Sequence, residues 1–311
     1  MRSLRPAALA LLSAAFGLVS ADARAADDAA KAKALIITGA NNHKWQDTTV
    51  VLKDMLEQSG FFSVDVSEDP EAPVLSEPET LAKYKVIVLN FNRGKRWEPA
   101  REENFLNYVR NGGGLLVYHA SDNAFPGWDE YDRLVGGTWR SKGTAFPQRG
   151  TFHPPYGTFQ VTVVDAEHPI TSGLGSSFEC RDEMYTNLKL ADNIRVLAQG
   201  VYEKKPQPLL FVSDYGKGRM FQTALGHDVE AMKNPRFKDT LIRGALGRRL
   251  AGRSLRPGPG MRLRLWGLRV PRVVFNPCCT ARPRHGFRGR NPWHPRASLR
   301  KLRRFEPMRG T

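Results

Sequence analysis

The sequence predicts an α/β fold built on an open, mostly parallel sheet. Between residues 34 and 250, short and continuously apolar segments alternate with amphipathic helical segments, and the connections between them are short. Continuously apolar strands are typical of parallel sheets, because such strands are buried on both faces. We therefore expect right-handed crossovers between the strands of the first half.

The first half of this region supplies the expected parallel strands. Gly60 ends the first helix, and Gly112 to Gly114 end the third, so both helices stop where a tight turn is favoured. The expected strands are 34–38, 61–66, 86–89 and 115–118, and the expected helices are 46–59, 77–84 and 98–110.

The second half adds an antiparallel hairpin region. Gly216-Lys217-Gly218 is a turn signal between two strand-like segments. The expected strands are 158–165, 195–202, 209–213 and 219–225, and a helix over 234–250 closes the region. We expect one domain over residues 34–252.

The net charge of +16 is concentrated at the end of the chain. Residues 253–311 hold 15 Arg and one Lys against a single acid, so they carry +15 and the preceding 252 residues carry +1. A nearly neutral body gives no reason to expect a nucleic-acid partner. We interpret the basic, Pro-rich tail as disordered or as the product of a frameshift near 247–253. An Arg-rich arm for nucleic acid or anionic surfaces is the functional alternative.

Residues 1–25 have the features of a secretory signal peptide. Two arginines precede an apolar run over 6–19, and Ala23-Arg24-Ala25 fits a signal peptidase site. A retained anchor is the alternative, but the run is shorter than the roughly 20 residues that a spanning helix needs. We expect cleavage, a spacer over 26–33, and export to the periplasm or the medium, with no membrane span after cleavage.

Polar side chains gather where the predicted strands end, which is where ligands bind in open α/β sheets. We predict that His119, Glu183 and His227 are catalytic, and that His43, Trp45, Asp122, Tyr185 and Asp228 bind substrate. Imidazole and carboxylate ligands from several loops suit a divalent ion such as zinc. His43, His119, Glu183 and His227 are therefore also candidate metal ligands, although no HExxH or CxxC motif is present.

Each of these residues also has a structural interpretation. In this interpretation His43 is a loop residue hydrogen-bonded to backbone, His227 caps the hairpin, and Glu183 is a solvated acid on a surface strand. Ser121, close to the end of the fourth strand, is a candidate for a displaced nucleophile.

Six motifs follow one another in a fixed order along the domain. They are His43-x-Trp45, Gly112-Gly-Gly-Leu-Leu-Val-Tyr-His119-Ala120, Tyr131-x-x-Leu-Val-Gly136-Gly137, Asp165-x-x-His168-Pro169-Ile170, Asp182-Glu183-x-Tyr185 and Gly216-x-Gly218-Arg-Met-Phe-x-x-x-Leu-Gly226-His227. Together they resemble the ThuA-like (trehalose utilisation) family over residues 34–250. The resemblance implies a class I glutamine amidotransferase-like fold with a flavodoxin-like sheet.

The resemblance also narrows the chemistry. The amidotransferases carry a Cys nucleophile at the turn where this chain has His119, so glutamine hydrolysis through a thiolate is not expected. The family implies a role in the catabolism of disaccharides or glycosides, with histidines lining the pocket. Residues 142–155 depart from the family pattern, which leaves the role of His153 open.

The residues are consistent with two functions. The first is an exported carbohydrate-processing enzyme, a hydrolase or lyase, that acts on disaccharides, glycosides or their keto derivatives through the His- and Glu-lined pocket. The second is a non-catalytic carbohydrate- or partner-binding domain on an amidotransferase-like scaffold. In either case Trp45, Trp97 and Trp128 suit stacking on sugar rings, with core packing as the alternative.

Overall fold

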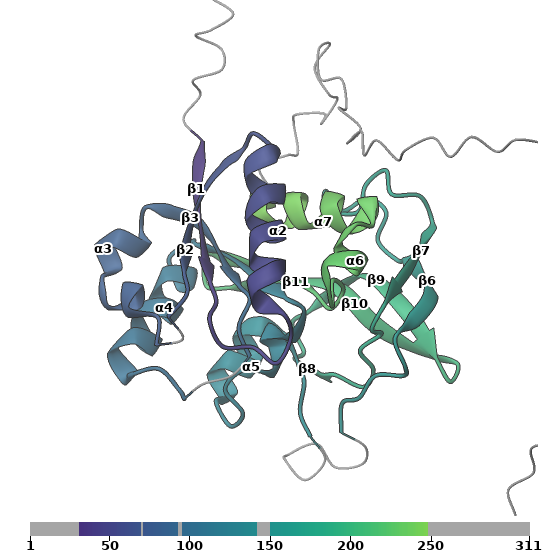
Figure 1. Cartoon of the computed structure of the whole chain (residues 1–311). Helices are drawn as coiled ribbons and strands as arrows, with labels where there is room; N and C mark the ends of the chain where they lie inside the picture. Colours follow the sequence, from purple (N-terminus) through teal and green to yellow (C-terminus); the bar gives the residue numbers. More distant parts are fainter. Residues whose placement is uncertain (1–30, 70, 93–94, 142–149, 248–311) are drawn as a thin grey trace, which may run out of the picture. The chain divides into compact units, whose positions relative to one another are not determined.

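A nine-stranded sheet forms the centre of the computed structural model, which describes residues 31–69, 71–92, 95–141 and 150–247 (Figure 1). The described residues belong to one compact unit. The predicted signal peptide over 1–25, most of the predicted spacer and the tail over 253–311 lie outside them. No helix in these ranges is long and apolar enough to cross a membrane.

Five parallel strands form one half of the sheet, as the apolar pattern predicts. β1 (Ala32–Ile37) lies between β2 (Phe62–Ser67) and β3 (Tyr84–Leu89), and then β4 (Gly114–Tyr118) and β11 (Gly218–Thr223) follow in that order. The last four residues of β1, β3 and β4 are all buried. Burial on both faces is the state that continuous apolar strands require.

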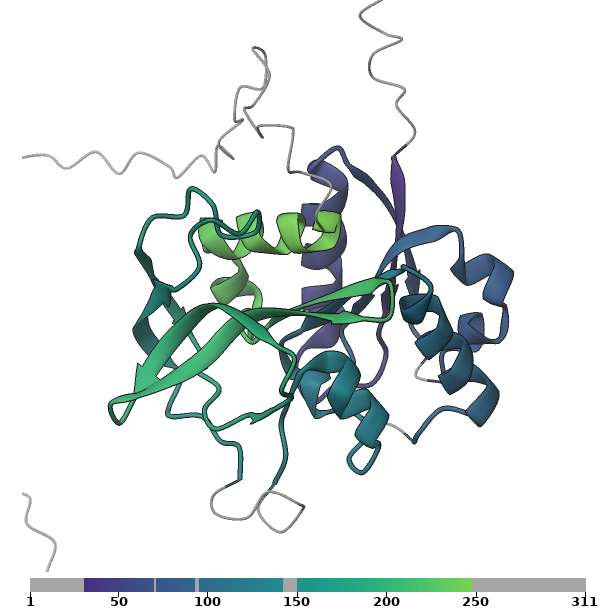
Figure 2. The ribbon, with the colours of Figure 1, turned by 180° about the vertical axis from the view of Figure 1, so that it is seen from behind.

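Helices cover the two faces of this parallel half. α2 (Trp45–Gln58), α6 (Val229–Met232) and α7 (Pro235–Leu246) contact one another on one face (Figure 1). α3 (Pro78–Leu81) and α4 (Pro99–Arg110) contact each other and the 3-10 turn η1 (Pro73–Ser76), and lie with α5 (Asp129–Val135) on the opposite face (Figure 2). Right-handed crossovers require this split, because the chain first adds a strand on one side of β1 and then on the other.

Four antiparallel strands continue the sheet beyond β11. They are β10 (Lys205–Tyr215), β9 (Arg195–Tyr202), β6 (Gly157–Val163) and β7 (Ser177–Asp182), in that spatial order. Exposed and buried residues alternate along β7, as expected for an edge strand with one face in solvent. The short strands β5 (Gly137–Thr138) and β8 (Lys189–Leu190) pair separately.

The second half contains elements that the sequence pattern does not predict. β7 and α5 are absent from the expected set, and β10 begins at Lys205, four residues before the expected strand. Pro206 and Pro208 argue against a strand there, since proline cannot donate to a ladder. The structure accommodates Pro208 at a register shift in the pairing of β10 with β9.

Because of the direction in which β7 runs, strands from both halves of the sheet end at the same edge. Four antiparallel pairings separate β11 from β7, so the two strands run in the same direction. Four strand spacings would hold their ends about 19 Å apart in a flat sheet. Instead, Asp182 at the end of β7 accepts a hydrogen bond from the Gly226 amide, which follows β11, at 2.6 Å. The sheet therefore curls, and the carboxyl ends of β1, β3, β4, β11 and β7 face a common site.

Candidate metal centre and substrate cavity

His43 lies in the loop after β1, and its ring orientation is fixed by an asparagine. The Asn41 side-chain oxygen accepts hydrogen bonds from the His43 backbone amide and from His43 Nδ1, both at 2.9 Å. The Asn41 amide nitrogen in turn donates to Asn90, which follows β3, at 3.1 Å. Because a carboxamide oxygen only accepts, the proton resides on Nδ1, and the Nε2 lone pair of His43 is available for a ligand.

His119 is the first residue after β4 and begins the 3-10 turn η2 (His119–Asn123). Its backbone φ of 42° lies in the left-handed region, which is unfavourable for a residue with a side chain. Nδ1 donates to the Ala224 carbonyl at 2.7 Å, and Nε2 accepts from the Tyr185 hydroxyl at 2.9 Å. Burial lowers the pKa of His119 to about 4, so the imidazole is neutral near pH 7.

Asp182 ties His227 and Glu183 together. Its buried carboxylate accepts hydrogen bonds from the backbone amides of Gly226 at 2.6 Å, His227 at 3.0 Å and Glu183 at 2.8 Å. Gly226 has a φ of 97°, and a Cβ at that position would lie 2.6 Å from the Phe237 ring. The turn that aims His227 therefore requires glycine.

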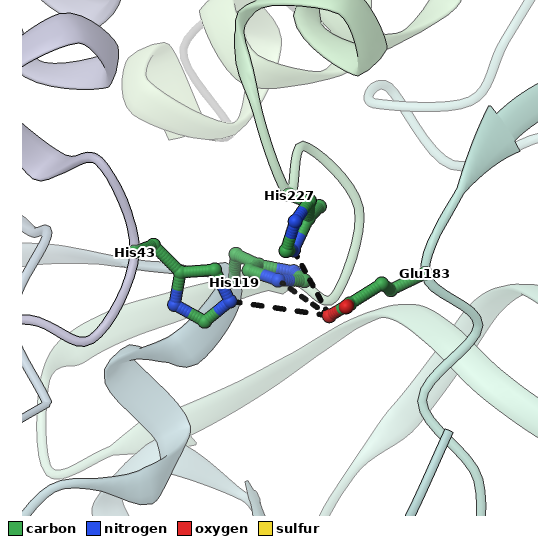
Figure 3. Close-up of side chains that lie close together, drawn as sticks. All are labelled: His43, His119, Glu183 and His227. Carbon is green, nitrogen blue, oxygen red and sulfur yellow. Dashed lines mark ion pairs between the residues drawn. The ribbon is translucent and has the colours of Figure 1, made fainter. Parts of the chain in front are cut away.

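Three imidazoles converge on one carboxylate oxygen (Figure 3). Glu183 Oε2 lies 3.0 Å from His227 Nδ1, 3.7 Å from His119 Nε2 and 3.9 Å from His43 Nε2. One ligand atom from each of these four residues lies within 4.8 Å of the others. His153 Nε2 lies 3.5 Å from the other carboxylate oxygen, Oε1, and its side chain is 38% exposed.

The charges in this cluster favour an ionised carboxylate. Burial alone would raise the pKa of Glu183, but the imidazoles of His119, His227 and His43 around its carboxylate hold that pKa well below its usual range. Burial would lower the pKa of His227, but Glu183 raises it. The centre thus contains one negative charge surrounded by imidazoles.

The geometry of the four ligand atoms fits a divalent ion. Ligands about 2.1 Å from a tetrahedral ion lie about 3.4 Å from one another, and the three separations from Glu183 Oε2, 3.0 to 3.9 Å, bracket this value, while all four atoms lie within 4.8 Å of one another. His227 Nδ1 is buried and has no hydrogen-bond partner within the described ranges, although Oε2 is close. An orphaned buried nitrogen is accounted for if it binds a metal ion. Three nitrogens and one oxygen suit zinc and other first-row divalent ions.

Three of the four candidate ligands, His43, Glu183 and His227, form part of the wall of a cavity of about 530 Å³. This volume lies within the range of small-molecule sites. Five residues predicted for the site line it, namely His43, Glu183, Tyr185, His227 and Asp228. Further lining residues, which the sequence interpretation did not assign to the site, are Asn42, Lys44, Asn92, Ala120, Asn123, Trp139 and His153.

Asn42 and Asn92, like His43 and His119, lie in the segments that follow parallel strands. They come after β1 and β3, and each side chain hydrogen-bonds the other residue: the Asn42 backbone amide donates to Asn92 Oδ1 at 3.1 Å, and Asn92 Nδ2 donates to Asn42 Oδ1. Polar residues that follow parallel strands are therefore the signal that identifies them. Trp139 follows β5, a two-residue strand, and no periodic pattern marks that position.

Other predicted residues lie away from the cavity lining. Trp45 is the first residue of α2, and Asp122 is fully buried, where its Oδ2 accepts from Gln222 at 3.2 Å. Burial raises the pKa of Asp122 well above its ordinary value. The Ser121 hydroxyl donates to the Leu89 carbonyl at 2.6 Å and accepts from the Phe91 amide at 2.9 Å, so it supports backbone.

Comparisons with known proteins agree with the fold and the motifs. The profile of the ThuA family, described as trehalose utilisation, matches residues 33–246. A putative ThuA-like protein from Parabacteroides merdae is 32% identical, with a TM-score of 0.64 over 70% of this chain and 89% of that one. A putative ThuA-like protein from Bacteroides uniformis is 21% identical, with a TM-score of 0.54 over 69% and 89%. A search of curated proteins found no match.

The family match covers most of the chain and all six motifs, and its solved relatives share the α/β architecture. The amidotransferase-like sheet predicted from the motifs is consistent with these neighbours. The chain belongs to the ThuA family, described as trehalose utilisation.

Proposed function

We propose that this protein is a divalent-metal-dependent enzyme that processes carbohydrates, with disaccharides, glycosides or their keto derivatives as substrates. The observation that carries the proposal is the convergence of three imidazole nitrogens and one carboxylate oxygen within 4.8 Å, at the wall of a polar cavity. The family description supports a sugar as the substrate class.

His43, His119, His227 and Glu183 would hold the ion. A bound zinc or similar divalent ion would act as a Lewis acid that polarises a carbonyl or hydroxyl oxygen of the substrate. Asn41 and the Ala224 carbonyl fix the His43 and His119 rings by holding each Nδ1 proton, so each Nε2 carries a lone pair; at His119 that lone pair accepts from the Tyr185 hydroxyl, which an ion would displace. Such outer partners orient metal ligands in many proteins.

Glutamine hydrolysis through a cysteine thiolate does not fit this site. His119 occupies the turn after β4, and Cys180 lies in β7, where burial raises its pKa well above the ordinary value. A buried thiol with a raised pKa is a poor nucleophile. The catalytic groups of an amidotransferase are therefore replaced by a metal-binding set.

We also propose export to the periplasm or the medium, on the strength of the signal-like residues 1–25. Cell fractionation with N-terminal sequencing tests this. A mature chain that begins after Ala25 outside the cytoplasm supports export, and an uncleaved cytoplasmic chain contradicts it.

The enzymatic proposal is tested on the purified full chain. Bound metal is quantified by mass spectrometry, and disaccharides and their keto derivatives are assayed before and after chelation. His119→Ala should abolish metal binding and turnover. His168→Ala is the matched control, since His168 lies outside the cluster and its Nδ1 accepts a hydrogen bond from the Ile170 amide. Sugar binding without turnover of any substrate would indicate a carbohydrate-binding domain instead. Full activity after complete metal removal would exclude the metal role.

A further inference from the structure

Trp139 is set apart from the other tryptophans in the described ranges by its place on the cavity wall. Trp97 and Trp128 are only 2% and 6% exposed and pack in an aromatic cluster with Phe91 and Phe125. Trp45 begins α2 outside the cavity lining. Trp139 is partly exposed and lines the cavity.

The backbone at Trp139 is fixed on both sides. The Trp139 amide donates to the Asp122 carbonyl at 3.2 Å, and its carbonyl accepts from Arg140 Nη1 at 2.8 Å. The Arg140 side chain is only 3% exposed and forms an ion pair with Asp132. A large ring on a fixed backbone binds a ligand at low cost in conformational entropy.

The indole ring lies one aromatic ring away from the metal ligands. Its centroid is 4.7 Å from that of Tyr185, in an edge-to-face contact with an interplanar angle of 71°. The Tyr185 ring centroid is 4.4 Å from that of His119, and their polar atoms are hydrogen-bonded. Trp139 also lines the same cavity as His43, Glu183 and His227, so a ligand in the cavity can contact both the indole and these candidate metal ligands.

The remaining lining is polar and suits hydroxyl groups. Asn123 lies on the cavity wall, is partly exposed, and its side chain makes no hydrogen bond to another residue of the described ranges. Its carboxamide can both donate and accept, which matches the dual character of a sugar hydroxyl. Lys44 and Asp228 add one charge of each sign to the lining. A lining that combines the Trp139 and Tyr185 rings with these polar groups matches a ligand with an apolar face and a polar rim.

A sugar in its closed ring form has this shape. The C–H groups of one face form an apolar patch that packs on an aromatic ring, while the hydroxyls point outward to polar partners. An open-chain polyol has the same hydroxyls but no preformed flat face, so it loses more conformational entropy on binding.

We propose that Trp139 is the stacking platform that selects a closed pyranose ring and holds it against the metal centre, with Asn123 binding its hydroxyls. This inference rests on the proposed carbohydrate function and adds the ring form of the substrate and the residue that selects it. Trp139 acts on the affinity for the sugar and not on the affinity for the ion, because within the described ranges no hydrogen bond or ring contact joins it to any of the four candidate metal ligands.

The test uses the full chain loaded with zinc, titrated with trehalose, methyl glucoside and the open-chain hexitol sorbitol by calorimetry. The wild type should bind the two pyranosides and prefer them to sorbitol by at least about tenfold. Trp139→Ala should weaken pyranoside binding by about tenfold, and Trp139→Phe should stay within about threefold of the wild type. Trp45→Ala is the matched control and should retain the wild-type sugar affinity. All variants should bind zinc with wild-type affinity.

The outcomes separate this inference from the proposed function. If Trp139→Ala binds pyranosides as tightly as the wild type, or if the wild type does not prefer pyranosides to sorbitol, the stacking role is wrong while the metal-dependent activity can stand. If the wild type binds no zinc and turns over no sugar, the proposed function itself fails. If zinc affinity falls in Trp139→Ala together with sugar affinity, Trp139 supports the metal centre and not the sugar, which also overturns the inference.

Discussion

Replacing Tyr185 by phenylalanine should increase the affinity of the protein for zinc. The Tyr185 hydroxyl donates to His119 Nε2 at 2.9 Å, and this is the lone pair that an ion requires. The ion must displace a hydrogen bond that contributes about 0.5–1.5 kcal/mol. Removing this competition corresponds to a dissociation constant lower by about two- to twelvefold. Titration against a competing chelator measures the change.

The same substitution should destabilise the metal-free protein. Without the hydroxyl, His119 Nε2 becomes a buried acceptor without a donor, since the residue is only 1% exposed. An unsatisfied buried group costs about 1–3 kcal/mol, which denaturant unfolding in the presence of chelator would reveal. Zinc affinity and metal-free stability therefore change in opposite directions. An unchanged or weaker zinc affinity would refute the view that the hydroxyl and the ion share one lone pair.

Tyr131→Phe is the matched control for this experiment. Tyr131 is also fully buried, and its hydroxyl donates to the Ser121 carbonyl at 2.7 Å, outside the set of four ligand residues. Its loss should lower the free energy of unfolding without changing zinc affinity. A change in zinc affinity in this variant would show that general loosening of the core, and not competition at His119, explains the result.

Two further substitutions test contacts with the backbone, the first at the site and the second within the sheet. Asp182→Asn replaces one of the two oxygens that accept backbone hydrogen bonds by an amide group. Zinc affinity should therefore fall by about 10- to 100-fold in the chelator titration. The control Asp214→Asn, at an exposed position, should leave zinc affinity unchanged. A variant Asp182→Asn with wild-type affinity would count against the positioning role. Gly218→Ala places a Cβ 2.0 Å from the Val109 carbonyl, so the free energy of unfolding should fall by at least about 1–3 kcal/mol. Gly157→Ala, whose Cβ would come no closer than 3.5 Å to any neighbour, should stay within about 0.5 kcal/mol of the wild type, and equal stabilities of the two variants would contradict the steric argument.

The parallel half of the fold is predictable because its strands have only one plausible interpretation. The segments 34–38, 86–89 and 115–118 are apolar except for Thr38, and the structure has β1, β3 and β4 there with boundaries shifted by at most two residues. α2 and α4 end at the polar caps Ser59 and Asn111, whereas the helix expected over 77–84 is only α3 (Pro78–Leu81) and Tyr84 already belongs to β3. The antiparallel half is harder, because β7 alternates exposed and buried residues over only six positions. Polar residues on its solvent face dilute the apolar signal.

The site is predictable to the extent that its residues follow parallel strands. His43 and His119 come directly after β1 and β4, and one rule places both at the same edge. Trp139 escapes this rule, since β5 belongs to the small separate sheet and the Trp139 backbone is held by a long-range bond to Asp122 and by the side chain of the adjacent Arg140. Its place on the cavity wall depends on tertiary contacts that no local pattern encodes. Chain position alone therefore indicates Trp45 as the substrate-binding tryptophan, although Trp45 lies outside the cavity lining.

The position of Glu183 depends on the number of strands in the antiparallel half. An even number of antiparallel pairings separates β7 from β11, so the chain leaves β7 at the edge where β1, β4 and β11 also end. One strand fewer or more would put Glu183 at the opposite edge, far from all three histidines. The four candidate ligands thus come from both halves of one curled sheet, and an ion bound to them would cross-link those halves next to the Asp182 contacts. Metal binding should therefore be coupled to the stability of the whole antiparallel half, because a ligand that binds only the native state stabilises every element needed to form its site.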